Sequence, residues 1–300
     1  MIGMPTPTVR RLQLGNELRH LRERAGLELA DAGEVIERTW ATVSKLENGI
    51  TGIRQKPLRE LVEHYAEVIG TGADGAPADG GEPIDPDAFC ELNKGAENRG
   101  RWRGYRSAHP AHFRMAVDLE TDAQSMNIYQ TEVIHGLLQT EEYMRSMFEN
   151  VRYGDVETEN RIKARLERQA VLHKQDAELT AVLSESALRR MYGSREVMAR
   201  QMRHLADAAE LPSVHLHVLP FAAIPSLASS FPFVHFRVPS VSTNAPPLEF
   251  VYVEQFSNGD YLDGSTHVSA YNRLWQGLLG AALDPVESRA FVLRVADEFD

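Results

Sequence analysis

Residues 26–49 carry the pattern that most constrains this chain. The stretch reads GLELADAGEVIERTWATVSKLENG, and its apolar positions follow helical spacing on both sides of a short polar interruption. Thr39 is a suitable N-cap for the second half, because its hydroxyl can accept an early backbone N–H. The pattern predicts two short helices joined by a tight turn, the second running from Trp40 to about Glu47.

The second predicted helix has an apolar inner side and a polar outer side. Val43 and Leu46 are expected to pack inward with Ala32 and Ile36, and the small residues at 32 and 33 allow the two helices to cross closely. An exposed second helix of this kind enters the DNA major groove in helix-turn-helix proteins. Its hydroxyl and ammonium groups can bond to base edges or phosphates. We therefore expect DNA contacts from Thr39, Trp40, Ala41, Thr42, Ser44, Lys45 and Arg54.

The hairpin has neighbours that predict a small helical bundle. A helix is expected over residues 10–25, with Leu14, Leu18 and Leu21 on one stripe and its arginines elsewhere, and another begins near Pro57. Residues 70–87 are rich in Gly, Pro and Asp and have no apolar periodicity, which is typical of a linker. We predict a helix-turn-helix domain over 1–70 with four to five helices, a flexible linker over 71–87 and a second domain over 88–300.

The second domain mixes helices and strands, so we expect a mixed α+β fold of unassigned strand order. The predicted strands are 125–134, 179–184, 214–219, 231–238 and 248–254. The predicted helices are 88–100, 110–126, 141–150, 157–174, 185–192, 195–209, 268–283 and 285–298.

Charge and composition limit the function classes. The net charge is −11, yet residues 1–70 contain ten basic and ten acidic residues, so the acidic excess lies beyond residue 70. Such a distribution predicts modest, salt-sensitive DNA affinity for a monomer, and dimerisation would compensate. A single cysteine and the lack of long apolar runs predict a cytoplasmic protein that does not enter membranes.

The second domain contains few groups that suggest chemistry. His215 and His217 share one face of a predicted strand, but two histidines are too few for zinc, and His109 and His112 are expected to be equally inert. Cys90 has no obvious paired base. We expect no catalytic residue, metal or cofactor.

Two other residue groups leave alternatives open. A helix with Arg161, Lys163, Arg165 and Arg168 is expected to present a solvated face, with binding of phosphate or an acidic partner as the alternative. A set of phenylalanines is expected to fill the sheet core, although an effector pocket is also compatible: Phe221, Phe231, Phe233, Phe236 and Phe250.

The chain resembles a known family at these positions. The run from Val43 to Gly49, VSKLENG, is similar to the hairpin exit of phage-repressor-type (Xre-type) helix-turn-helix regulators, although Leu29 stands where that family usually has glutamine and Glu37 where it often has glycine. GLLQTEEY, residues 136–143, resembles the C-terminal domain attached to such hairpins in actinobacterial regulators. The resemblance implies a transcriptional regulator, often paired with a small partner protein.

We therefore expect a non-enzymatic, sequence-specific regulator of transcription that binds double-stranded DNA as a homodimer. The C-terminal domain would serve dimerisation or the sensing of a partner protein or small-molecule effector. A helical hairpin also occurs in protein-binding bundles, so the alternative is an antitoxin-like module that binds a small partner protein. The spacing of the hairpin alone does not separate the two.

Overall fold

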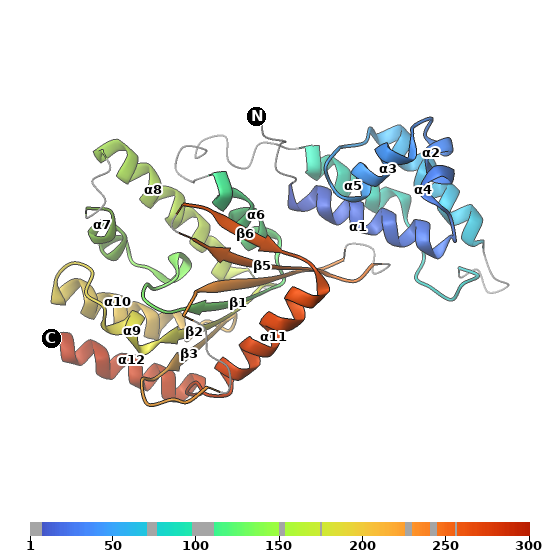
Figure 1. Cartoon of the computed structure of the whole chain (residues 1–300). Helices are drawn as coiled ribbons and strands as arrows, with labels where there is room; N and C mark the ends of the chain where they lie inside the picture. The colour runs from blue at the N-terminus through green and yellow to red at the C-terminus, as the bar shows by residue number, and fades with distance from the viewer. Residues whose placement is uncertain are drawn as a thin grey trace. The chain divides into compact units, whose positions relative to one another are not determined.

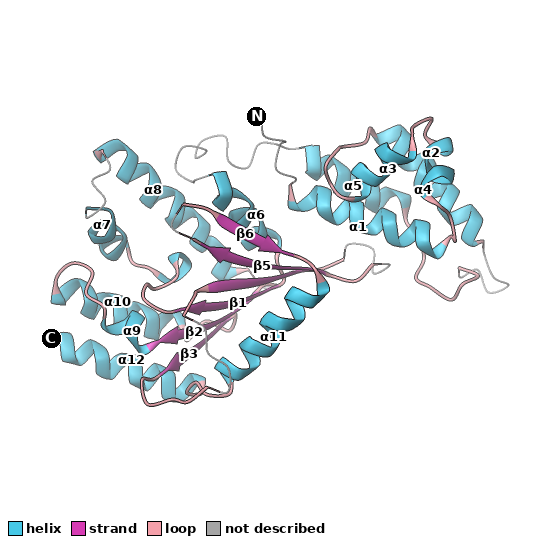
Figure 2. Cartoon of the chain, viewed as in Figure 1, coloured by secondary structure: helices cyan, strands magenta, loops and turns pink. Residues whose placement is uncertain are grey.

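The computed structural model describes residues 8–70, 77–97, 111–149, 154–174, 176–225, 230–240, 245–255 and 257–300. The chain divides into two units. The first contains residues 1–103 and 239–248, and the second contains residues 104–238 and 249–300. Figure 1 traces the chain through both, and Figure 2 shows that the described part of the first unit is helical whereas the second contains the sheet.

The first unit is an all-α bundle. Its helices are α1 (Val9–Arg24), α2 (Leu29–Val35), α3 (Trp40–Glu47), α4 (Gln55–Ile69) and α5 (Pro86–Glu97). Thr8 caps α1, because its hydroxyl accepts the backbone N–H of Arg11 at 3.4 Å. Gly26, with a φ of +67°, allows the reversal that follows α1.

The apolar stripes expected from the sequence meet in one core. Leu18 and Leu21 of α1 are fully buried, and so are Ala32 of α2 and Val43 of α3. Helix α4 adds Leu58, Leu61, Val62 and Tyr65 to the same core. The predicted inward set of the hairpin is thereby confirmed.

Helix α5 completes this bundle instead of opening the second domain. Phe89 and Leu92 are 2% and 6% exposed and lie in the core of the first unit. Asn93 donates from its amide to the carbonyl of Ile53 at 2.9 Å, and Gln55 donates to the carbonyl of Cys90 at 3.1 Å. The second unit therefore does not begin at residue 88, where the sequence predicted the start of the second domain. A flexible linker over 71–87 stays a prediction, since residues 71–76 lie outside the described residues.

A second, distant segment also belongs to the first unit. Residues 239–248 follow one strand of the sheet and precede another, yet their described part packs on α1. Gln13 donates to the carbonyl of Pro239 at 3.2 Å, and the hydroxyl of Ser240 donates to the buried carboxylate of Glu17 at 2.6 Å. No apolar pattern in the sequence indicated this contact, because it consists of polar side chains and carbonyl groups.

The second unit contains a six-stranded sheet of order β3-β2-β1-β4-β5-β6. The strands are β1 (Ser125–Gln130), β2 (Glu178–Ser184), β3 (Val214–Leu219), β4 (Phe233–Val238), β5 (Leu248–Glu254) and β6 (Gly259–Leu262). Strands β1, β2 and β3 are parallel, whereas β4 runs antiparallel to β1 and β6 antiparallel to β5. The mixed α+β fold predicted from the sequence is confirmed, and the short strand β6 was missed.

Helices cover the sheet. Trp275 and Leu278 of α11 (Ser265–Leu279) pack on the face formed by Tyr129, Val182 and Val251. The opposite face receives α6 (Arg114–Asp122), and α8 (Asp155–Arg168) packs on α6. The remaining helices are η1 (Ala111–Phe113), η2 (Gly136–Leu138), α7 (Glu141–Glu149), η3 (Gln169–His173), α9 (Glu185–Arg189), α10 (Arg195–Ala208) and α12 (Pro285–Phe299).

Two expectations about this unit were wrong in part. Phe233, Phe236 and Phe250 are buried as expected, but Phe221 and Phe231 are 67% and 70% exposed, because they lie outside the strands that bury their neighbours. The charged helix α8 is not simply a solvated face. Its Arg168 is buried, and its guanidinium donates to both carboxylate oxygens of Glu120 at 2.8 and 2.6 Å.

Candidate nucleic-acid interface

The turn between α2 and α3 is tight and strained. Glu37 has a φ of +52°, a left-handed conformation that costs a non-glycine residue about 1 kcal/mol. Gly33 allows the close approach that the sequence predicted, since a Cβ there would lie 2.6 Å from the carbonyl oxygen of Arg38. This geometry fixes the angle at which α3 leaves α2.

Thr39 occupies the N-cap position of α3, but its hydroxyl does not make the backbone hydrogen bond that the sequence predicted. Its backbone has the extended conformation of an N-cap residue, yet its side chain makes no hydrogen bond to a backbone N–H. Its hydroxyl lies 3.1 Å from the hydroxyl of Thr42 instead. Both hydroxyls therefore lie together at the start of the helix, where they retain unused hydrogen-bonding capacity.

The outward residues expected on α3 are accessible to different degrees. Trp40 is 62% exposed, and Thr39 and Lys45 are exposed as well. Ala41, Thr42 and Ser44 are half-buried. Arg54 is exposed, but it lies outside the helix, at the N-cap of α4. Six of the seven candidate residues thus belong to α3 or its cap.

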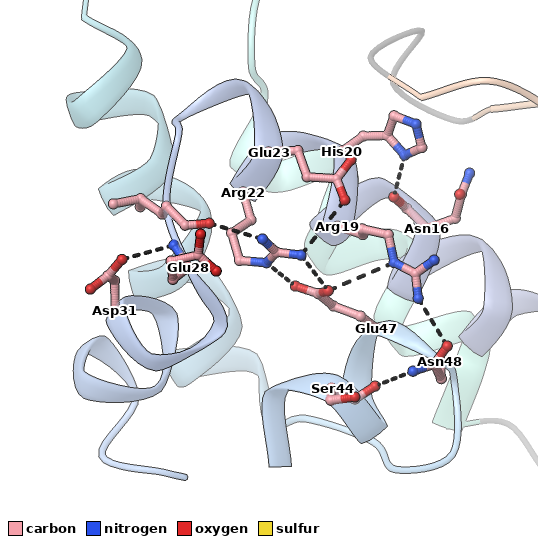
Figure 3. Close-up of polar contacts among 11 residues, drawn as sticks. Asn16, Arg19, His20, Arg22, Glu23, Glu28, Asp31, Ser44, Glu47 and Asn48 are labelled. Carbon is pink, nitrogen blue, oxygen red and sulfur yellow. Dashed lines mark hydrogen bonds and ion pairs between the residues drawn. The ribbon is translucent and has the colours of Figure 1, made fainter. Parts of the chain in front are cut away.

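A buried ion pair fixes the other end of α3. Glu47 accepts hydrogen bonds from Arg22 of α1 at 2.7 and 3.0 Å, and its side chain is 3% exposed. Arg22 also donates to the carbonyl of Leu27 at 2.9 Å, in the turn after α1 (Figure 3). Its hydrogen bonds to Glu47 raise the pKa of Arg22 above its usual range. The pair and this hydrogen bond connect α1, the turn that follows it and the end of α3.

The residue after α3 extends this network toward the surface. Asn48 donates to the carbonyl of Ser44 at 2.7 Å and accepts a hydrogen bond from Arg19 at 2.9 Å (Figure 3). Gly49 follows with a φ of +68°, and a Cβ there would lie 2.9 Å from the side chain of Leu12. The Leu-Glu-Asn-Gly run therefore consists of one core residue, one ion-pair partner, one hydrogen-bonding cap and one required glycine.

Helix α1 crosses the end of α3 closely. A Cβ at Gly15 would lie 2.3 Å from the carbonyl oxygen of Glu47 and 2.8 Å from that of Leu46. Only glycine fits such a crossing without movement of the backbone. The inner face, the turn and the exit of α3 are thus all fixed by named contacts, which leaves its outer face as the free surface of a rigid helix.

Two acidic residues lie at the start of α2. Glu28 and Asp31 form a capping box, in which the backbone N–H of Glu28 donates to the carboxylate of Asp31 at 2.8 Å (Figure 3). Both carboxylates are exposed, and Glu34 and Glu37 are exposed later in the hairpin. These charges oppose phosphate binding at the start of α2, so cations on α3 and α4 must supply the attraction.

The polar contacts that hold the end of α3 were not predicted from the sequence. The helical pattern placed Arg19 and Arg22 merely away from the leucine stripe of α1, whereas both reach the end of α3. The spacing of 25 residues between Arg22 and Glu47 gives no periodic signal. The one available signal was an acidic residue next to Leu46, on the inward side of a helix only two turns long.

The described histidines of the second unit do not form a metal-binding group. His217 lies on β3 with its Nδ1 2.9 Å from the carbonyl oxygen of Leu283, and in the described part of the chain no three His, Cys, Asp or Glu side chains form a group able to hold a metal. His109 lies outside the described residues. Cys90 is buried in α5.

No helix among the described residues is long and apolar enough to span a membrane. Comparison with known proteins gives two family matches. A model described as a helix-turn-helix domain matches residues 13–76, and a model described as a domain of unknown function, DUF5753, matches residues 113–294. No curated protein and no solved structure matches the chain. The second model covers more than half of the sequence, and the chain therefore belongs to the DUF5753 family.

Proposed function

We propose that this protein is a sequence-specific DNA-binding regulator of transcription, in which α3 enters the major groove. The observation that carries the proposal is the contrast between the two sides of α3. Val43, Leu46 and Glu47 are buried and fixed, while Trp40 is 62% exposed at the start of the same helix. A rigid helix with such an exposed face, inside a helix-turn-helix match, is suited to reading base edges.

The proposed contacts divide by chemistry. Lys45 and Arg54 would neutralise phosphates or reach guanine, while Thr39, Thr42 and Ser44 would bond to base edges or phosphates. Trp40 and Ala41 would make apolar contacts, for example with thymine methyl groups. Two cations are few for a tight complex, so a second copy of the hairpin in a homodimer would be needed for high affinity.

The second unit would provide dimerisation or sensing in this proposal. It contains most of the acidic excess of the chain, which is unfavourable near DNA, so a direct role in DNA contact is disfavoured. A regulatory role fits a fold with its own core and its own sheet. The finer assignments, to phage-repressor-type regulators and to an actinobacterial source, rest on the resemblance alone.

A second function is favoured by one observation. Phe221, Ile224 and Phe231 are 67%, 92% and 70% exposed, and a contiguous patch of such side chains would mark a surface that binds another protein. The alternative is therefore an antitoxin-like module that binds a small partner protein. The two functions differ in whether purified protein selects DNA.

The test is recovery of DNA from sheared genomic fragments by the purified full-length protein. A recovered fragment is then compared with a scrambled one by fluorescence anisotropy over a salt series. We expect selective binding that weakens steeply with salt. The double variant Thr42→Ala/Lys45→Ala should lose the preference, while Lys163→Ala, an exposed cation of the second unit, should keep it.

Two results would count against DNA recognition. One is the recovery of no enriched fragment, together with a stable complex with the product of a neighbouring gene, which would favour the alternative. The other is an unchanged preference in the double variant, which would place base reading outside α3.

A further inference from the structure

A cavity of about 60 Å³ lies in the second unit, between α6 and one face of the sheet. Helix α6 contributes Glu120, β4 contributes Phe236 and β5 contributes Tyr252. A water molecule needs roughly 10–15 Å³ by this measure, so the cavity has room for about four or five non-hydrogen atoms.

Aromatic rings form much of its wall. The rings of Phe113 and Tyr252 meet edge to face with centroids 5.9 Å apart, and Phe236 is 1% exposed beside them. The faces of such rings carry negative potential and attract cations, while their carbon atoms favour an apolar group. The guanidinium of Arg168 already lies over the ring of Phe113, 4.9 Å from its centroid. The rings of Tyr252 and Tyr261 pack with centroids 4.8 Å apart, so the wall offers an occupant mainly apolar carbon surface.

Two polar groups in the wall have no hydrogen-bond partner among the described residues. The hydroxyl of Tyr252 is buried and is one of the two. Nδ1 of His135 accepts the N–H of Leu137 at 3.4 Å, so the ring proton belongs on Nε2. That Nε2 lies 3.9 Å from the nearest carboxylate oxygen of Glu120, which is too far for a hydrogen bond. The Tyr252 hydroxyl can accept a hydrogen bond from a polar occupant, whereas the Nε2–H of His135 needs an acceptor such as a water molecule.

The charge of the wall selects the sign of the occupant. Its described charged residues, Glu120 and Glu254, are both acidic. Arg168 already occupies both oxygens of Glu120. Glu254 has no side-chain hydrogen bond among the described residues and is exposed, so its carboxylate lies at the mouth of the cavity. His112, Arg165 and Arg168 act on Glu254 electrostatically, but none of the three lines the cavity.

We propose that this cavity binds a small organic ammonium ion. Its apolar part would lie among Phe113, Phe236 and Tyr252, and its ammonium group would pair with the carboxylate of Glu254. An anion of the same size would face two carboxylates, and a neutral molecule would leave Glu254 without a partner. Such a site would specify the effector for the sensing role proposed above. Binding of the ammonium ion does not depend on that role, but its regulatory effect does.

The cavity also has a direct connection along the chain to the first unit. Strands β4 and β5, which form part of its wall, are joined by residues 239–247. The described part of that segment packs on α1 through Gln13, Asn16 and Glu17. A ligand that shifts β4 or β5 would therefore act on the segment that contacts the helix-turn-helix bundle.

The experiment uses full-length protein without DNA. Propylammonium chloride, 1-propanol and sodium propionate form a set of cationic, neutral and anionic probes of nearly equal size. Each is titrated to about 50 mM at constant ionic strength while the melting temperature and the methyl NMR signals are recorded. A site of this size saturates only at millimolar ligand. We expect a saturable rise in melting temperature and shifts of the Ala116 and Val234 methyl signals with propylammonium alone.

Two variants complete the test. Glu254→Gln should weaken propylammonium binding about tenfold, whereas Glu178→Gln, which removes an exposed charge at the start of β2, should leave it unchanged. Equal responses to the three probes, a stronger response to 1-propanol, or shifts of the exposed Val286 methyls without those of Val234 would overturn the proposal. Since no DNA is present, failure of DNA recognition would leave this result intact, and the reverse also holds.

Discussion

Glu47, the last residue of α3, accepts two hydrogen bonds from Arg22 of α1 at 2.7 and 3.0 Å in a buried setting. A buried pair of this kind is sensitive to the loss of one partner, because the other charge is then left without compensation. The position of α3 consequently depends on a contact that touches none of the residues proposed to bind DNA.

Replacing Glu47 with Ala should lower the free energy of unfolding of the first unit by about 3–5 kcal/mol. Replacing both partners with apolar residues, Arg22→Met/Glu47→Leu, should restore most of that loss because no charge remains buried. Hydrogen exchange of peptides from α1 and α3 in a urea series measures the effect. Glu157→Ala removes the exposed i,i+4 pair with Arg161 and should cost less than about 1 kcal/mol. Equal losses for the two pairs would contradict the burial argument.

Glu37→Gly should stabilise the first unit by about 1 kcal/mol, because φ at this position is +52° and glycine adopts it without strain. It should also tighten DNA binding, since one negative charge beside α3 is removed. The matched control is Glu34→Gly, which removes the same charge from inside α2 but should destabilise by about 1 kcal/mol, the helix penalty of glycine. Denaturant midpoints of the two variants should therefore move in opposite directions.

Burial lowers the pKa of His135 to about 3 from an ordinary value of 6.5. The unfolded chain therefore binds this proton near pH 6.5, while the folded chain resists it until far lower pH. The contribution of neutral His135 to the free energy of unfolding is fully present above pH 6.5. It decreases as the pH falls toward 3, and about 2 kcal/mol of it is lost at pH 5. His135→Gln should flatten the dependence of the denaturant midpoint on pH between 7 and 5. His267→Gln, at an exposed site on α11, should not, and parallel profiles for all three proteins would disprove the assignment.

The apolar framework of the molecule could be predicted from the sequence because it is periodic. Strands β3 and β5 begin and end where alternation and β-branched residues placed them, and α3 begins after Thr39 as its cap residue indicated. Local propensity and burial agree at these positions. The family match over residues 13–76 then supports the helix-turn-helix prediction.

Features that depend on contacts between distant residues could not be predicted. Helix α5 follows a linker-like stretch, and only packing of Phe89 on the core of the first unit assigns it to that unit. Residues 239–248 interrupt the second unit through polar contacts such as that between Ser240 and Glu17. The positive φ of Glu37 has no sequence signal other than the family pattern, because glutamate does not favour that conformation.

Single substitutions on the outer face of α3 should distinguish residues that contact phosphates from residues that read bases. Lys45 is exposed, so if its ammonium neutralises a phosphate, Lys45→Ala should weaken binding to all sequences alike and reduce the slope of log K against log salt by about 1. Thr42→Ala leaves the charge unchanged, so it should keep the slope and cost about 1–3 kcal/mol on the preferred fragment only. Anisotropy titrations of both variants on preferred and scrambled DNA at several salt concentrations provide the measurement. If Lys45→Ala acts on the preferred fragment alone with an unchanged slope, Lys45 contacts a base instead of a phosphate, and the cations that bind the backbone must be sought at Arg54 and beyond.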